Sequence, residues 1–149
     1  MSTKNKRVAI GVVAAITIYA LWSGHLIYTL TTVSIPFVST RTGILTQTLK
    51  VLLHVAIQTY LHSGLFITAH DAMHGSVHSN RRVNRFLGRL SAFLFGAISY
   101  KRLLTNHMNH HRWPGQARDP DYIPKTQNFF VLSTILFLRY VTVRQIAIV

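Results

Sequence analysis

The chain opens with a long apolar stretch, and a second one follows after a short interval that contains bases. Residues 8–40 contain no charged side chain, and residues 51–69 contain none either. A membrane-spanning helix needs about 20 predominantly apolar residues, so each run is long enough to cross a bilayer. The pattern predicts two membrane-spanning helices, over about residues 8–30 and 51–69.

Two further apolar stretches are shorter or interrupted by charge. Residues 86–100 include Arg89, and their length suits an interfacial or re-entrant helix better than a full crossing. Residues 129–149 carry Arg139 and Arg144, which are costly inside a bilayer unless they face protein or water. We interpret residues 129–149 as a helix near the membrane interface or as the first part of a hairpin.

Composition favours a membrane protein over a basic soluble protein. Only 13% of the residues are charged, whereas soluble domains carry about 25%. A nucleic-acid-binding protein would distribute its bases among amphipathic elements, but here they lie mostly outside the apolar runs. Cysteine is absent, which excludes disulfides, Cys–zinc sites and thiol catalysis. We therefore expect an all-α integral membrane bundle, forming one domain over residues 1–149, that contacts lipid and no nucleic acid.

The bases fall on one side of the predicted spans. Three precede the first span, two lie between the spans, and nine lie in residues 70–125 after the second: Arg81, Arg82, Arg85, Arg89, Lys101, Arg102, Arg112, Arg118 and Lys125. Positively charged loops stay in the cytoplasm, so the N-terminus and residues 70–125 are expected there. A cleaved signal peptide is the alternative for the first run, but that run is too long and lacks a small-residue cleavage site.

Five of the nine histidines form two tight clusters. His70 and His74 follow the second apolar run with HxxxH spacing, and His107, His110 and His111 form an HxxHH string in the basic segment. Residues four apart share a helix face, and the second cluster covers about a third of the circumference at about 3.6 residues per turn. Two such faces that meet at the membrane surface would present five imidazoles to a metal.

The ligand type favours iron over zinc. A structural zinc commonly includes Cys and a catalytic zinc uses three protein ligands and water, fewer than the two clusters offer. Imidazole also suits iron, copper and nickel. We interpret the clusters as a non-haem iron site at the cytoplasmic face, with two irons sharing them. The alternative is that these histidines are polar residues at helix ends that contact lipid phosphate.

The other four histidines are interpreted separately. His25, His54 and His62 lie within the apolar runs, where a neutral, hydrogen-bonded imidazole is the commoner arrangement. A pair of intramembrane histidines could also hold haem. His78 would continue the face of the first cluster, but Gly75 and the polar residues after it predict that the helix ends first, which leaves a ligand role open.

Four strings carry a resemblance to a known family. They are GLFITAHDAMHG at residues 64–75, HMNHH at 107–111, DPDY at 119–122 and QNFF at 127–130. They resemble the bacterial and cyanobacterial beta-carotene ketolases of the membrane fatty-acid-desaturase-like superfamily. The two histidine spacings alone indicate the superfamily, whereas HDAMHG and DPDY are more specific to the ketolases.

The resemblance implies a desaturase-like helical bundle with two irons on its cytoplasmic face. It implies that a carotenoid from the bilayer is oxidised at C4 of its beta-ionone ring, with dioxygen and with electrons from a donor such as ferredoxin. Two hydroxylations give a geminal diol that loses water to leave a ketone, so beta-carotene becomes echinenone or canthaxanthin. By position, His70 and His74 match the family's first cluster, and His107, His110 and His111 match its second.

The family's third cluster, another HxxHH, has no counterpart within residues 1–149. The sequence stops inside an apolar stretch at Val149, so we expect a fragment of a longer enzyme that is inactive alone. The host membrane, plasma membrane or thylakoid, is not distinguished by the sequence. Two other functions remain as alternatives: a fatty-acyl desaturase or hydroxylase of the same superfamily, and a non-catalytic membrane protein that binds haem or serves assembly.

The three aspartates are the only acids in the chain. Metal-bound histidines usually donate their other ring N–H to an acceptor, so Asp71, which adjoins the first cluster, is expected to orient a ligand or to position the substrate ring. Asp119 and Asp121 flank a proline, so they either orient ligands or form a turn. The bases of residues 81–89 either contact anionic lipid headgroups or dock an acidic electron donor.

Overall fold

The computed structural model describes residues 3–32, 41–122 and 128–140, and within them it contains helices and no strand. The five helices are α1 (Thr3–Thr32), α2 (Arg41–Met73), α3 (Arg81–Gly96), α4 (Tyr100–Arg112) and α5 (Phe129–Tyr140). The all-α prediction is confirmed. The predicted apolar segment 129–149 is represented by α5, and its last residues lie outside the described part of the chain.

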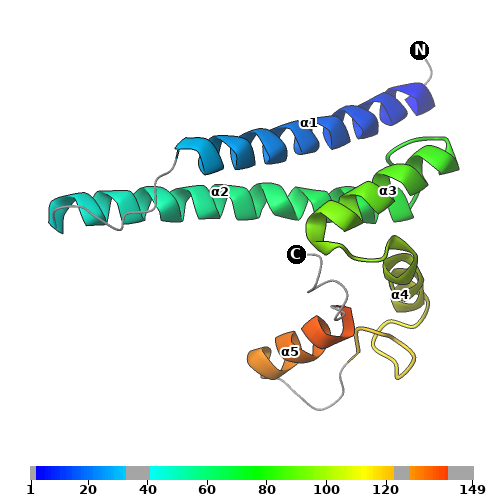
Figure 1. Cartoon of the computed structure of the whole chain (residues 1–149). Coiled ribbons are helices and arrows are strands. Elements are labelled where there is room, and N and C mark those ends of the chain that lie inside the picture. Colours follow the sequence, from blue (N-terminus) through cyan, green and yellow to red (C-terminus); the bar gives the residue numbers. More distant parts are fainter. Residues whose placement is uncertain (1–2, 33–40, 123–127, 141–149) are drawn as a thin grey trace.

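Helices α1 and α2 lie side by side, and α3 packs against the C-terminal half of α2 (Figure 1). The apolar parts of α1 and α2, Ile10–Thr32 and Gly43–Met73, are each long and apolar enough to cross a membrane. Many of their large apolar side chains are exposed, such as Leu30 and Tyr60. A helix that is apolar all round belongs in a bilayer or in a large core, so these exposed surfaces suit contact with lipid.

Polar side chains join α1 to α2 within the apolar spans. His25 Nδ1 lies 2.6 Å from Gln58 Oε1, and its Nε2 lies 3.1 Å from His54 Nδ1. Trp22 Nε1 donates to His62 Nδ1 at 3.2 Å, and His62 Nε2 donates to the Phe95 carbonyl at 2.8 Å. The prediction of hydrogen-bonded imidazoles at these three positions is confirmed. Because every polar ring atom in lipid needs a partner, these bonds fix how the two helices pair.

Small residues let α3 pack closely against its neighbouring helices. The buried face of α3 is made of Asn84, Gly88, Ser91 and Ala92. Ala69 of α2, which is fully buried, packs in one core cluster with Ala92 and with Tyr100 and Leu103 of α4. This packing places the C-terminal end of α2 beside the beginning of α4.

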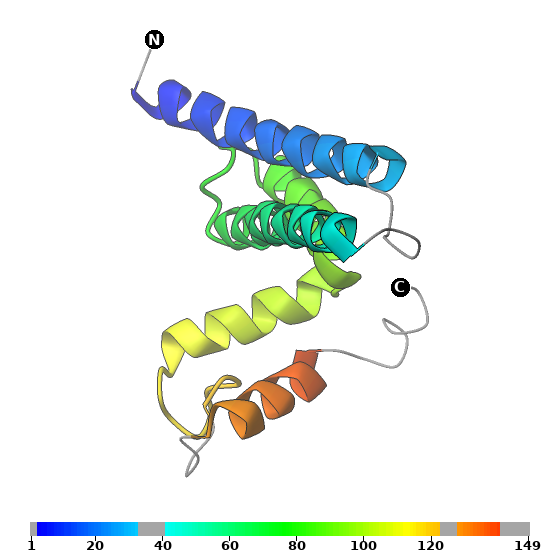
Figure 2. The same ribbon diagram turned by 90° about the vertical axis from the view of Figure 1, so that its left-hand side faces the viewer.

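The helix predicted over about residues 86–100 corresponds to α3, which begins earlier and ends at Gly96, and only Tyr100 of the predicted range belongs to α4. Ala97 adopts a left-handed conformation with φ 53°, and its N–H donates to the Phe93 carbonyl at 2.7 Å. Ser99 then caps α4 through its side chain. Figure 2 looks nearly along α2 and shows α4 running across it. The end of the helix differs from the predicted one because apolar content alone does not reveal this reversal, which turns the second histidine cluster toward α2.

The contact between α3 and α4 depends on the absence of a side chain at Gly88. A Cβ atom there would lie 2.3 Å from Cε2 of the buried Tyr100 ring. We expect Gly88→Ala to destabilise the protein by about 1–3 kcal/mol, as overpacked cores do, when thermal unfolding is measured in detergent. Gly24→Ala is the matched control, because no atom lies within 4 Å of that Cβ, and it should be neutral or stabilising. Equal melting temperatures for the two variants would contradict this packing.

Candidate metal centre

The two histidine clusters meet where the end of α2 faces α4. His70 and His74 come from α2, and His107 and His111 come from α4. One ring nitrogen of each lies within 4.8 Å of the others. Their helical spacing explains the pairing, since residues four apart lie on one face of a helix. The structure therefore brings together four of the five predicted metal ligands.

His107 lies at the middle of this group. Its Nε2 atom lies 2.8 Å from Nε2 of His74 and 3.1 Å from Nε2 of His111. Its ring centroid lies 4.7 Å from that of His70, with the rings edge to face. Ring nitrogens from two helices thus converge on one small volume, as ligands of a shared metal must.

Burial and the neighbouring imidazoles lower the pKa of His107 to about 4. A positive charge on a neighbouring imidazole would repel a positive charge on His107, so protonation of His107 is disfavoured. A neutral imidazole keeps the lone pair that a metal needs. Neutral nitrogen donors without any thiolate suit iron, copper, nickel or zinc, and the residues present therefore fit a transition metal such as iron.

His110 is the predicted ligand that the structure places apart from the other four. Its Nδ1 atom lies 3.0 Å from both carboxylate oxygens of Asp119 and 3.8 Å from Oδ2 of Asp121. Its ring centroid lies 6.1 Å from that of His111. The hydrogen bond to Asp119 raises the pKa of His110. With Nδ1 donating to a carboxylate, the Nε2 lone pair of His110 is left for a metal.

Asp119 combines the two roles that the sequence left open. It is only 5% exposed, and it accepts the backbone N–H groups of Gly115 and Asp121 at 2.9 Å each. Burial alone would raise the pKa of Asp119, but these two hydrogen bonds and the contact with His110 hold it below its usual value. The carboxylate therefore closes the turn after α4 and holds the imidazole of His110 at the same time.

Asp71 contacts the first cluster from an exposed position. Its Oδ1 atom lies 3.3 Å from Nδ1 of His70, and about half of its side chain is exposed. The same residue borders a cavity of about 260 Å³ between α1 and α2. Asp71 thus contacts a histidine of the two clusters as Asp119 does, but at a longer distance and with more solvent around it.

His78 lies outside the group of four, as the predicted helix end required. Helix α2 stops at Met73, and Gly75 takes a left-handed φ of 72°. Nδ1 of His78 accepts the backbone N–H of Asn80 at 2.8 Å. The buried Asn84 holds the backbone of His78 on both sides, accepting from its N–H and donating to its carbonyl. His78 therefore helps to shape the loop between α2 and α3.

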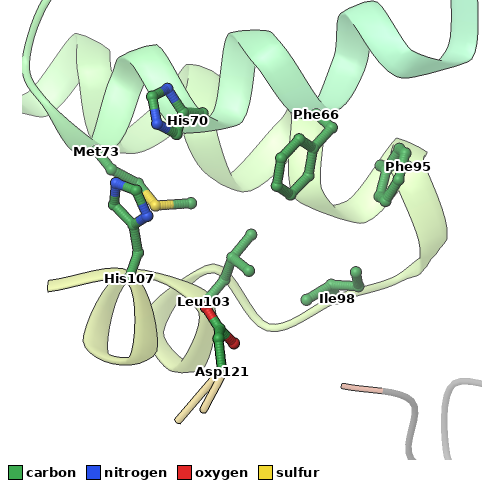
Figure 3. Close-up of a pocket in the computed structure, with 8 residues that line it drawn as sticks. All are labelled: Phe66, His70, Met73, Phe95, Ile98, Leu103, His107 and Asp121. Carbon is green, nitrogen blue, oxygen red and sulfur yellow. The ribbon is translucent and has the colours of Figure 1, made fainter. Parts of the chain in front are cut away.

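An apolar cavity of about 450 Å³ lies next to the imidazoles (Figure 3). Its lining consists of Phe66, His70, Met73, Phe95, Ile98, Leu103, His107 and Asp121. The two histidines of the lining come from α2 and α4 and belong to the group of four. The apolar members of the lining could not be predicted from the sequence, because their approach depends on the turn at Ala97 and on side chains from three helices. The only sequence signal was the apolar content of residues 86–100.

The chain matches the family described as fatty acid desaturase over residues 46–148. It is 34% identical over 137 residues to a zeaxanthin 4-ketolase of Chlamydomonas reinhardtii, covering 91% of this chain and 31% of that protein. It is 49% identical over 65 residues to a beta-carotene ketolase of Paracoccus sp. (strain PC1), covering 43% of this chain and 27% of that protein. It is 33% identical over 127 residues to a beta-carotene 4-ketolase 3 of Haematococcus lacustris, covering 75% of this chain and 40% of that protein.

The chain thus spans less than half the length of each of these relatives. No solved structure matches the chain.

Proposed function

Because the chain belongs to the fatty acid desaturase family, we propose that it forms part of the catalytic site of a membrane-bound carotenoid ketolase. The observation that carries the proposal is the convergence of four imidazoles beside an apolar cavity of about 450 Å³. Relatives named as ketolases of beta-carotene and zeaxanthin support the substrate class. These substrates are long, mainly apolar polyenes that dissolve in lipid, and the mainly apolar lining suits one of their rings.

The proposed metal is iron, with two ions sharing the histidines and dioxygen as co-substrate. His70, His74, His107 and His111 would hold it directly, and His110 would contribute Nε2. When bound, the iron would activate dioxygen, which oxidation of a carbon–hydrogen bond requires. Asp119 holds the ring of His110, and Asp71 holds the ring of His70, each through Nδ1. The protein's own contribution is to keep His107 neutral, to orient the rings of His70 and His110, and to exclude water from the substrate ring.

The proposed reaction converts one ring methylene into a ketone in three steps. Each of two hydroxylations at C4 consumes one dioxygen, two electrons and two protons, and releases one water. The resulting geminal diol loses a further water to leave the carbonyl group. A soluble electron donor such as ferredoxin would supply the electrons at the cytoplasmic side. The exposed arginines of α3, together with the positive-inside rule, support the placement of the N-terminus and both clusters on that side, in a plasma membrane or thylakoid.

Expression in cells that accumulate beta-carotene tests the function. With the complete open reading frame, we expect ketocarotenoids whose absorption is shifted to longer wavelength, identified by chromatography and mass. Cells that carry the empty vector are the control. Unchanged carotenoids together with new double bonds or hydroxyl groups in the acyl chains would contradict the proposal and favour an acyl desaturase or hydroxylase.

A further inference from the structure

Asp121 brings a carboxylate to a cavity that is otherwise mainly hydrocarbon. It lines the cavity together with the aromatic rings of Phe66 and Phe95, and its side chain is about one-third exposed. In Figure 3 it lies beside Leu103, across the pocket from α2, which carries Phe66. The position of Asp121 is fixed through its backbone N–H, which donates to Asp119 at 2.9 Å.

Three side chains of the cavity lining are polar, and only two of them belong to the group of four imidazoles. His70 and His107 belong to the group of four imidazoles. Asp121 is the lining residue outside that group that can accept a strong hydrogen bond. Its Oδ2 atom lies 3.8 Å from Nδ1 of His110, but a carboxylate offers about four lone-pair positions. The carboxylate can therefore stay beside His110 and still accept a hydroxyl group from within the cavity.

The relatives indicate which hydroxyl group this would be. One relative is named as a ketolase of zeaxanthin and another as a ketolase of beta-carotene. Zeaxanthin carries a hydroxyl on the ring carbon next to C4, and beta-carotene carries none. A hydroxyl buried in an apolar pocket is costly unless it finds an acceptor, and a bond to a charged acceptor is among the stronger ones.

We propose that Asp121 accepts a hydrogen bond from a hydroxyl group beside the reacting ring carbon, and that this carboxylate allows the cavity to take hydroxylated rings. The proposal rests on the function proposed above. A ring without the hydroxyl also fits, because Asp121 keeps its contact with His110 when no substrate hydroxyl is present. Asp121 therefore determines the range of rings that enter the cavity, and the metal ligands perform the reaction.

Kinetics with the protein from the complete open reading frame test this role. For Asp121→Ala we expect kcat/KM for zeaxanthin to fall about 10- to 100-fold, the range for a hydrogen bond to a charged group, with little change for beta-carotene. Asp121→Asn keeps one acceptor oxygen and should recover part of the loss. Phe66→Leu is the control on the opposite wall, and it should affect both substrates alike. An equal loss for both substrates in Asp121→Ala would overturn the inference, because Asp121 would then act only through His110.

Binding separates this inference from the proposed reaction. Carotenoids quench tryptophan fluorescence, so the affinity of purified protein for each carotenoid can be measured without turnover. Selective loss of zeaxanthin affinity in Asp121→Ala supports the role of Asp121 even if the wild type forms no ketone, in which case the reaction assignment fails alone. Unchanged affinity for both carotenoids would overturn the inference even where the wild type forms ketone.

Discussion

Replacing His107 with alanine is expected to remove bound metal and to abolish ketone formation in the protein from the complete open reading frame. His107 joins the two helices of the site, since its Nε2 atom lies 2.8 Å from that of His74 and 3.1 Å from that of His111. Loss of a direct ligand should exceed the roughly 10- to 100-fold effect of removing an outer partner. Metal content by mass spectrometry and ketone yield by chromatography measure the two consequences.

His54→Ala is the matched control for this experiment. His54 is a histidine of α2 that contacts His25 within the membrane span, and His25 keeps its bond to Gln58 when His54 is removed. We expect metal content and ketone yield to stay close to those of the wild type. If His107→Ala kept full metal content and activity, the assignment of the imidazole group would be wrong.

Replacing Asp119 with alanine is expected to lower metal affinity by about 10- to 100-fold, the usual effect of losing a partner that orients a ligand. This buried carboxylate holds Nδ1 of His110 and two backbone N–H groups of the turn after α4. Asp71→Ala should have a smaller effect, because its contact with His70 is longer and half-exposed, and solvent weakens such a pair. Metal titration of the three proteins gives the order of affinities.

A second measurement separates orientation of His110 from general damage to the turn. The hydrogen bond to Asp119 raises the pKa of His110, so Asp119→Ala should return that pKa toward its ordinary value when it is measured without added metal. Nuclear magnetic resonance of the histidine rings follows this titration directly. An unchanged His110 pKa with unchanged metal affinity would show that the carboxylate does not act on the imidazole.

Local spacing in the sequence was sufficient to predict the pairing of four histidines. Positions 70 and 74, and positions 107 and 111, are each four apart, and one helical turn places such pairs on one face whatever the rest of the fold does. The absence of charge over residues 8–40 and 51–69 likewise predicted long helices, because only a helix satisfies its own backbone groups in lipid. Both predictions depend on periodicity within one element.

Features that depend on contacts between elements could not be predicted in the same way. His110 shares the helical face of its cluster, but its Nδ1 turns to Asp119, which the chain brings back through a turn. The cavity required α3 to end before Ala97, where a left-handed residue in an apolar run gave no sequence signal. The same turn places Asp121 in the lining of that cavity, which the sequence alone does not indicate.

X-ray absorption at the iron edge of the purified protein, expressed from the complete open reading frame, is the most direct test of a metal shared between α2 and α4. We expect bound iron surrounded mainly by nitrogen, with the outer-shell scattering of imidazole rings, and the loss of that signal when His74 and His107 are both replaced. A folded protein without iron, or an iron spectrum without imidazole scattering, would contradict a metal held by these two helices.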